Sequence, residues 1–223
     1  MTLVDDTGQS SNTLIYTVSI ESLSEDPTID WANPSGITYG TTLSSAQLNA
    51  SANVPGTFVY DPDIGALLNA GAGQPLEATF TPDDLDNYNI VVANASIDVE
   101  KASATLIAED EQRPYGHANP NFNYSASGLV AGYTIGDIDT PPSLSTDANS
   151  ASLVGSYPIN LSGASDPNYD FSYSAGEITV EPAPLTITAN NKARAFGQSP
   201  PPLTATFSGF VLGEGPEDLD TPF

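Results

Sequence analysis

The side chains whose type and spacing could do chemistry in this sequence are carboxylates. Calcium binds several carboxylate and carbonyl oxygens at once, so acidic residues gathered within a few positions are candidate ligands. Three such groups occur: Glu25, Asp26 and Asp30; Asp83, Asp84 and Asp86; and Asp137 with Asp139, which recurs as Asp218 with Asp220. None of them has the spacing of an EF-hand loop, with its central glycine and distal glutamate. Calcium is therefore the one candidate cofactor, and the group around Asp26 is the preferred candidate site, because a cation there would stiffen the linker.

Candidates for catalysis are fewer. His117 is the only histidine, and a histidine base needs a positioned partner. No Ser–His–acid or Cys–His arrangement is readable, and no histidine cluster could bind zinc. Paired carboxylates are expected by chance in a chain this acidic. We therefore read His117 as a polar turn residue and expect no catalytic residue and no enzyme.

The charge balance excludes two classes of partner. The chain has 28 acidic and four basic residues and a formal net charge of −24. Four scattered cations cannot neutralise a phosphate backbone, so we expect no nucleic acid, and binding to an anionic membrane surface is opposed for the same reason. There is no long apolar run, so we expect no membrane insertion. Cysteine is absent, which fits a large exported bacterial protein.

An internal repeat is the strongest signal. A shift of 81 positions aligns the residues from Ala102 onward with those from Ala183 onward without a gap, and about a third of the aligned residues are identical. The same shift also aligns residues at the ends of two successive units: Asn87-Tyr88 with Asn168-Tyr169, and Glu100 with Glu181. The matched residues include Arg113 with Arg194, Gly116 with Gly197, Gly128 with Gly209, Val130 with Val211, and the acidic pair Asp137 and Asp139 with Asp218 and Asp220.

The repeat predicts four segments. Residues 1–24, with an alternating run over 13–21, are read as the terminal strand of a preceding module. Complete modules follow at 25–101 and 102–182, and 183–223 corresponds to only the first half of the repeat. We therefore expect this chain to be an excerpt of a longer array, and we expect its last segment to be loosely packed.

The elements that position these residues are predicted to be short strands. Leu76, Ala78 and Phe80 alternate with Glu77 and Thr79, which is the pattern of a half-buried strand. Turn signals rich in Gly, Pro, Asn and Asp separate such runs at short spacing. The sequence predicts an all-β fold of tandem small modules.

Residues 25–101 contain an extended pattern that resembles a bacterial Ig-like repeat. The resemblance implies an Ig-like β-sandwich for this module. The residues that carry it lie in Asp30–Pro34, Ile37–Ser44, Pro55–Tyr60, Leu68–Gly71, Phe80–Asp83 and Asn87-Tyr88.

Residues 102–182 resemble the MBG domain of the YGX type, and 183–223 resemble its first half with Phe196-Gly197 in place of Tyr-Gly. The resemblance implies a compact β module, sandwich-like or β-grasp-like. The matching residues are Pro114-Tyr115-Gly116, Ser127–Val130, Gly155–Ile159, Asn168–Phe171 and Gly176–Val180.

An aromatic residue followed by glycine recurs once in each module, as Tyr39-Gly40, Tyr115-Gly116 and Phe196-Gly197. The dipeptide could be an aromatic platform for a ligand, or an anchor at the module entrance whose glycine lets the backbone turn. Recurrence in every module favours the anchor. Trp31, the only tryptophan, is likewise read as a packing residue.

Together these features suggest a structural stalk or spacer in a secreted or cell-surface bacterial protein of adhesin-like type, whose partners are neighbouring modules. Two alternatives remain open at this level: a module that binds carbohydrate or another protein, and an accessory region of a secreted enzyme.

Overall fold

The chain folds almost entirely into β-structure. The computed structural model describes residues 24–130 and 132–220, and within them it has fifteen strands, two single-turn 3-10 helices and no α-helix. The predicted all-β fold is confirmed. No helix in this part of the chain is long and apolar enough to cross a bilayer. The predicted strand over 13–21 lies outside the described residues.

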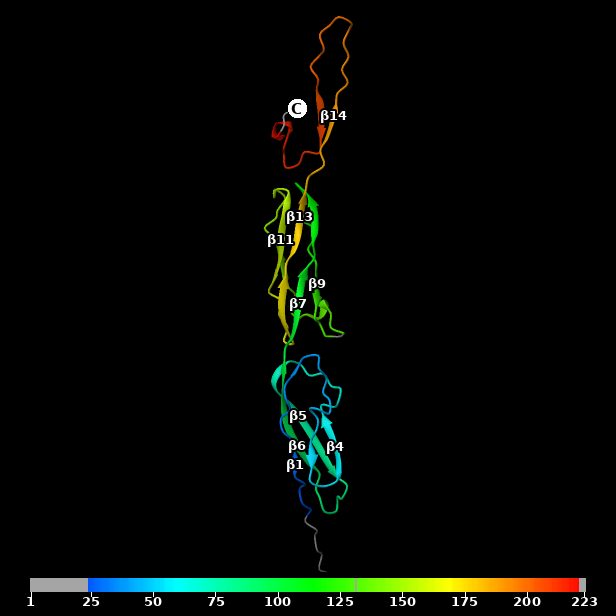
Figure 1. Ribbon diagram of the computed structural model, residues 1–223, viewed down its shortest axis with the longest axis vertical. Coiled ribbons are helices and arrows are strands. Elements are labelled where there is room, and N and C mark those ends of the chain that lie inside the picture. Colours follow the sequence, from blue (N-terminus) through cyan, green and yellow to red (C-terminus); the bar gives the residue numbers. More distant parts are fainter. Residues whose placement is uncertain (1–23, 131, 221–223) are drawn as a thin grey trace, which may run out of the picture. The chain divides into compact units, whose positions relative to one another are not determined.

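The described residues form two compact units (Figure 1). The first unit comprises 24–34, 43–66 and 75–97, and the second comprises 35–42, 67–74 and 98–220. The division differs from the predicted one because three segments of the predicted first module, 35–42, 67–74 and 98–101, belong to the second unit.

The first unit is built around the alternating strand that the sequence predicted. Strands β1 (Ile29–Asp30) and β3 (Ser51–Ala52) form a two-stranded sheet. Leu76, Ala78 and Phe80 are buried on one face of β5 while Glu77 on the other is exposed. A four-stranded sheet has the order β2 (Ile37–Thr38), β6 (Val91–Glu100), β5 (Gly71–Pro82) and β4 (Gly56–Asp61), with β5 and β6 running through both units.

Aromatic rings complete the packing of this unit. Phe58 on β4 lies opposite Phe80 on β5, with the ring centroids 4.7 Å apart. Trp31 packs edge-on against Tyr60 at 5.5 Å, and its indole N–H donates to the carbonyl of Gln47 at 3.1 Å. Trp31 is thus a packing residue, as expected.

The second unit contains two facing sheets. One has the order β10-β11-β13-β8 and the other the order β12-β7-β9, and β11 contacts both β7 and β12 across the gap. The β13/β8 and β12/β7 pairs are parallel and the others are antiparallel. The elements are β7 (Ala102–Ala108), β8 (Glu111–Pro114), β9 (Tyr124–Ser127), η1 (Ile135–Asp137), β10 (Ser143–Ser145), β11 (Gly155–Ser162), β12 (Tyr169–Ser174) and β13 (Gly176–Glu181).

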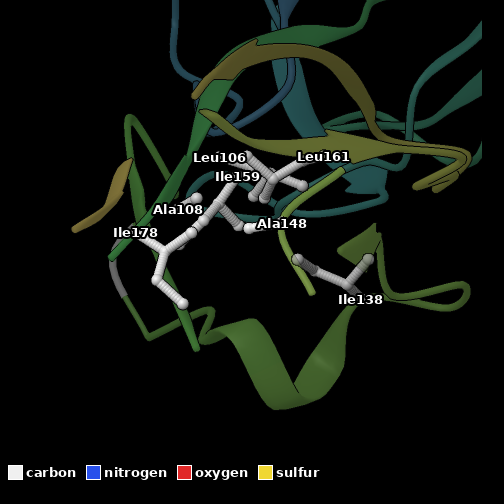
Figure 2. Packing of buried hydrophobic residues seen from close by; sticks show 7 residues of the cluster. All are labelled: Leu106, Ala108, Ile138, Ala148, Ile159, Leu161 and Ile178. Carbon is white, nitrogen blue, oxygen red and sulfur yellow. The ribbon is translucent and has the colours of Figure 1, made fainter. Parts of the chain in front are cut away.

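The core of residues 102–182 lies between these sheets. Leu106, Ile159 and Ile178 are fully buried and come from both sheets. Figure 2 shows how the side chains of the cluster converge. Because one core is shared by two sheets, this module is sandwich-like, which decides between the two arrangements left open by the sequence. The cluster consists of Leu106, Ala108, Ile138, Ala148, Ile159, Leu161 and Ile178.

Residues 183–220 carry β14 (Thr186–Ala189), β15 (Ala205–Ser208) and η2 (Pro216–Asp218). The register of β14 with β15 equals that of β7 with β9 shifted by 81 positions, and η2 likewise follows η1 by 81 positions. Strand β8 has no counterpart here. It pairs with β13, and the positions equivalent to β8, 192–195, are not in a strand.

Candidate functional site

The first predicted calcium group is held by hydrogen bonds within the first unit. Glu25 exchanges backbone hydrogen bonds with the 87–89 segment, donating to Asn87 O and accepting from Asn89 N–H at 2.9 Å each. The carboxylate of Asp26 accepts from the side-chain amide of Asn89 at 2.7 Å. Asp30 lies in β1 opposite Ser51. The structure thus places this group beside the turn that carries the second group, which sequence distance alone does not indicate.

In the second group, Asp84 shapes the turn before β6. Its Oδ1 accepts from the backbone N–H groups of Asp86 and Asn87 at 3.2 Å, and its Oδ2 accepts from the side-chain amide of Asn87 at 2.8 Å. These bonds, the Asn87 side chain first, lower the pKa of Asp84. Asp83 donates its backbone N–H to Pro55 O.

The repeated acidic pair includes a similar turn residue. Asp137 Oδ2 accepts from the backbone and hydroxyl of Thr134 at 2.8 and 2.6 Å, and Asp218 Oδ2 accepts from Gly215 N–H at 2.7 Å. Both cap their 3-10 turns. Within 24–130 and 132–220, no three Asp, Glu, His or Cys side chains gather closely enough to bind a metal, so calcium binding stays a prediction.

His117 is exposed and lies in a turn, where its backbone N–H donates to Pro114 O at 3.3 Å. This placement is the one expected for a polar turn residue. The turn belongs to the Tyr115-Gly116 motif, and the strongest candidate site of the molecule is built from this motif and its relatives.

Tyr39 and Gly40 form the first such site, which we call the Tyr39 contact. The backbone N–H of Tyr39 donates to the carbonyl of Glu100, the last residue of β6, at 2.8 Å. The ring of Tyr39 meets Tyr169 edge-on at 5.5 Å, and Tyr169 is only 2% exposed. Gly40 has φ +97°, and a Cβ added to it would lie 2.7 Å from a methyl group of Val130. Only glycine fits this close approach.

A buried polar network supports the Tyr39 contact. Asp166 accepts from the hydroxyl of Tyr133 and, at 2.8 Å, from the backbone N–H of Asn168. Asn168 Oδ1 in turn accepts from Ala70 N–H at 2.8 Å. Burial, and then the bond to Asp166, raise the pKa of Tyr133. The Lys101 ammonium donates to the carbonyl of Asp166 at 3.1 Å. Every buried polar group named here has a partner, so the network specifies one arrangement.

Tyr115 and Gly116 form an equivalent site, the Tyr115 contact. The backbone N–H of Tyr115 donates to the carbonyl of Glu181, the last residue of β13, at 2.8 Å. Its hydroxyl donates to Glu214 Oε1 at 2.8 Å, and this bond raises the pKa of Tyr115. Gly116 has φ +84°, and a Cβ added to it would lie 2.5 Å from Val211. A cleft of about 450 Å³ beside it is lined in part by Tyr115 and Val211.

Each valine is presented by a short segment, Ser127–Val130 or Ser208–Val211. The glycine in each segment lies against the backbone at the start of its own module, in β7 for Gly128 and just before β14 for Gly209. A Cβ on Gly128 would lie 2.9 Å from Ser103 O, and one on Gly209 would lie 2.3 Å from Pro184 O. We call these the Ser-Gly-x-Val segments. Sequence reasoning matched Val130 with Val211 but did not pair them with the Tyr-Gly motif.

The anchor interpretation of the motif is therefore supported, but its position differs from the one predicted. Each tyrosine is tied to the last residue of the strand that leads into the next module, and its ring or glycine packs on that next module. The motif lies at the exit of a module rather than at its entrance. In the third copy, Phe196-Gly197, no described residue packs on the motif in this way. Phe196 is fully exposed, with a relative solvent accessibility of 106%.

These sites join residues that belong to successive β modules. Their polar groups are hydrogen-bonded to one another, and their rings are packed. A family model described as MBG domain (YGX type) matches residues 104–179 and 185–222, just over half of the chain. No curated protein matches the chain.

Proposed function

This chain belongs to the MBG domain family of the YGX type, and on that premise we propose that it is a stalk. In this proposal a row of small β modules holds another domain of a bacterial secreted or surface protein at a distance. The first module is of the bacterial Ig-like type, and 102–182 and 183–223 are successive copies of the MBG repeat. The family occurs in bacterial surface proteins, which supports this assignment.

One observation carries the proposal: the two Tyr-Gly contacts are constructed alike. In both, the tyrosine N–H donates to the backbone carbonyl of the glutamate that ends the last strand of its own module, and the glycine lies against a valine from the Ser-Gly-x-Val segment of the next module. A main-chain bond and close apolar packing on either side of the covalent connection restrict rotation there. A flexible linker would have neither.

The remaining features are consistent with a spacer and give no support to an enzyme. The only histidine is exposed in a turn, and we propose that the chain has no catalytic activity. The net charge of −24 opposes association between copies and keeps an exposed stalk soluble. Tyr39 and Tyr115 are partly covered by neighbouring residues, so neither forms an open aromatic platform for a sugar.

The stalk proposal is tested by the stiffness of a module connection. The chain has no cysteine, so two introduced cysteines can carry spin labels without background. Labels at Ser156→Cys in β11 and Thr206→Cys in β15 measure a distance across the Tyr115 contact. Labels at Ser156→Cys and Gln112→Cys measure a distance within one sheet and serve as the control. All three side chains are exposed.

We expect a distance distribution across the contact nearly as narrow as that of the control pair. A distribution as broad as that of a Gly/Ser linker of similar length would refute a stiff stalk. Binding to a glycan array, lost on substitution of one aromatic residue, would favour the carbohydrate-binding alternative instead.

A further inference from the structure

The three aromatic-glycine turns have one conformation but differ in their surroundings. Gly40, Gly116 and Gly197 have φ of +97°, +84° and +81°. A Cβ on either of the first two would collide with a valine, whereas one on Gly197 would meet nothing within 4 Å. The third turn therefore has the shape of the others without the partner that they have.

The shape of the third turn is already set by its own hydrogen bonds. The N–H of Gln198 donates to Ala195 O at 3.1 Å, as the N–H of His117, 81 positions earlier, donates to Pro114 O. The guanidinium of Arg194 also donates to Gln198 O, at 2.8 Å. A partner would therefore meet a preorganised turn, and little conformational entropy would be lost on docking.

We propose that this turn, residues 194–198, is a docking site for a further MBG-type module that presents a Ser-Gly-x-Val segment. The module's valine covers Gly197, and its apolar surface covers the ring of Phe196. The two existing contacts show this pairing within the same chain. A large ring with full exposure in so acidic a surface is otherwise unfavourable, and burying it supplies the apolar part of the contact.

The chemistry of Phe196 also selects the kind of module. In the Tyr115 contact the tyrosine hydroxyl donates to Glu214, but phenylalanine has no hydroxyl. A carboxylate placed against Phe196 would lack this donor and would face an apolar ring instead of a hydrogen-bond partner. The repeat places Tyr133 at the position equivalent to Glu214. The preferred partner is therefore a module like 102–182, with tyrosines at the positions of Tyr133 and Tyr169, rather than one like 183–223.

A second copy of the chain is not the preferred partner. Both of its Ser-Gly-x-Val segments are already packed, against Gly40 and Gly116. The inference rests on the proposed function in one respect, that contacts of this type connect successive modules. Its test measures hydrogen exchange in the 194–198 turn itself, so its outcome is independent of the spin-label distance measurement above.

The experiment extends the chain. A copy of 143–182 is joined after Phe223, which by the 81-residue register completes the module begun at Ala183, and a copy of 102–182 follows. Amide hydrogen exchange is then followed at 195–198, with the amides of β14 and β15 as the folding control. We expect exchange at 195–198 to slow by about tenfold relative to an extended chain carrying Val130→Asp in the appended copy.

Two matched changes test the selectivity. Tyr133→Glu in the appended copy imitates Glu214 and should remove most of the protection. Because this change also removes the hydroxyl that bonds to Asp166, the diagnostic result is recovery of protection when Phe196→Tyr is added and supplies the hydroxyl donor. Equal exchange in all extended chains would overturn the proposal.

A further pair of variants uses the natural chain and does not depend on the extension. Tyr115→Phe alone should speed exchange of the His117 amide, because Glu214 loses its donor, and Tyr115→Phe with Glu214→Tyr should restore protection. If the double variant exchanges as fast as Tyr115→Ala, a phenylalanine-glycine turn cannot dock as proposed, and the inference is wrong.

Discussion

Gly116 lies directly against Val211: a methyl group added at the glycine would come within 2.5 Å of the valine Cβ. We therefore expect Gly116→Ala to open the Tyr115 contact. The change adds a collision to the strain of a positive φ in an L-residue, and each costs about 1–3 kcal/mol. Hydrogen exchange at the Ser208–Val211 segment should become faster.

Gly197→Ala is the matched control for that prediction. Gly197 has nearly the same φ, +81°, with open space around it, so its substitution carries the backbone strain without the collision. Equal effects of the two substitutions on exchange of the Ser208–Val211 segment would show that Val211 does not pack on Gly116 in solution.

Arg113 offers a second matched pair. It is 4% exposed, its Nε donates to Asn119 Oδ1 at 2.7 Å, and a terminal nitrogen donates to Pro114 O at 3.3 Å. Arg113→Ala leaves these acceptors without donors, so the free energy of unfolding of the second unit should fall by about 2–4 kcal/mol. Its repeat counterpart Arg194 is exposed, and Arg194→Ala should change stability by less than about 0.5 kcal/mol. Urea unfolding monitored by tyrosine fluorescence measures both, and a similar loss for the two would contradict the burial difference.

The stability of the second unit should fall at alkaline pH. Tyr133 has a pKa raised above the ordinary tyrosine value by burial and by its bond to Asp166, so the folded chain holds this proton more tightly than the unfolded chain. The stabilisation is fully present below about pH 10 and is lost as the pH rises above that value.

Unfolding midpoints measured from pH 8 to pH 11 test this expectation. Tyr133→Phe removes the titrating hydroxyl and should flatten the decline, whereas Tyr157→Phe, which leaves Asp166 untouched, should not. An unchanged slope in Tyr133→Phe would show that titration of Tyr133 does not cause the decline in stability.

Much of the secondary structure and the repeat register could be predicted from the sequence, but few of the tertiary contacts could. The alternation of Leu76, Ala78 and Phe80 marked a buried strand face because side chains of a strand alternate between its faces. The 81-residue shift matched positions that proved to share strand register. The Tyr39 contact was not predictable in the same way, since it joins Tyr39 to Tyr169 and Val130 across large sequence distances. Neither pattern nor propensity encodes such pairings.

Acidic residues were the least predictable part of the candidate site. Asp84 and Asp137 belong to clusters that could have been ligand sets, but each accepts hydrogen bonds from its own turn. Short-range bonding of this kind depends on backbone geometry that a count of carboxylates does not contain. Asp166, which the sequence did not single out, is the buried carboxylate that organises the Tyr39 contact.

Salt should stabilise the chain through its general charge rather than through one site. With a net charge of −24, repulsion among carboxylates destabilises the folded state, and counterions screen it over a Debye length of about 10 Å at 0.1 M. We expect sodium chloride to raise the unfolding temperature gradually. Calcium chloride at the same ionic strength should give a similarly gradual, non-saturating rise, because no three acidic side chains gather among the described residues.

The Asp26→Asn variant tests whether the effect of calcium chloride on the unfolding temperature comes from the predicted group Glu25, Asp26 and Asp30. Asparagine keeps a side-chain oxygen that can accept the Asn89 amide bond but removes the charge that a cation requires. If calcium produced a saturable increase in unfolding temperature, and Asp26→Asn but not Asp147→Asn abolished it, the gradual-screening prediction would be wrong. Calcium would then be bound at Glu25, Asp26 and Asp30, with backbone and amide oxygens completing the coordination that these three carboxylates do not complete by themselves.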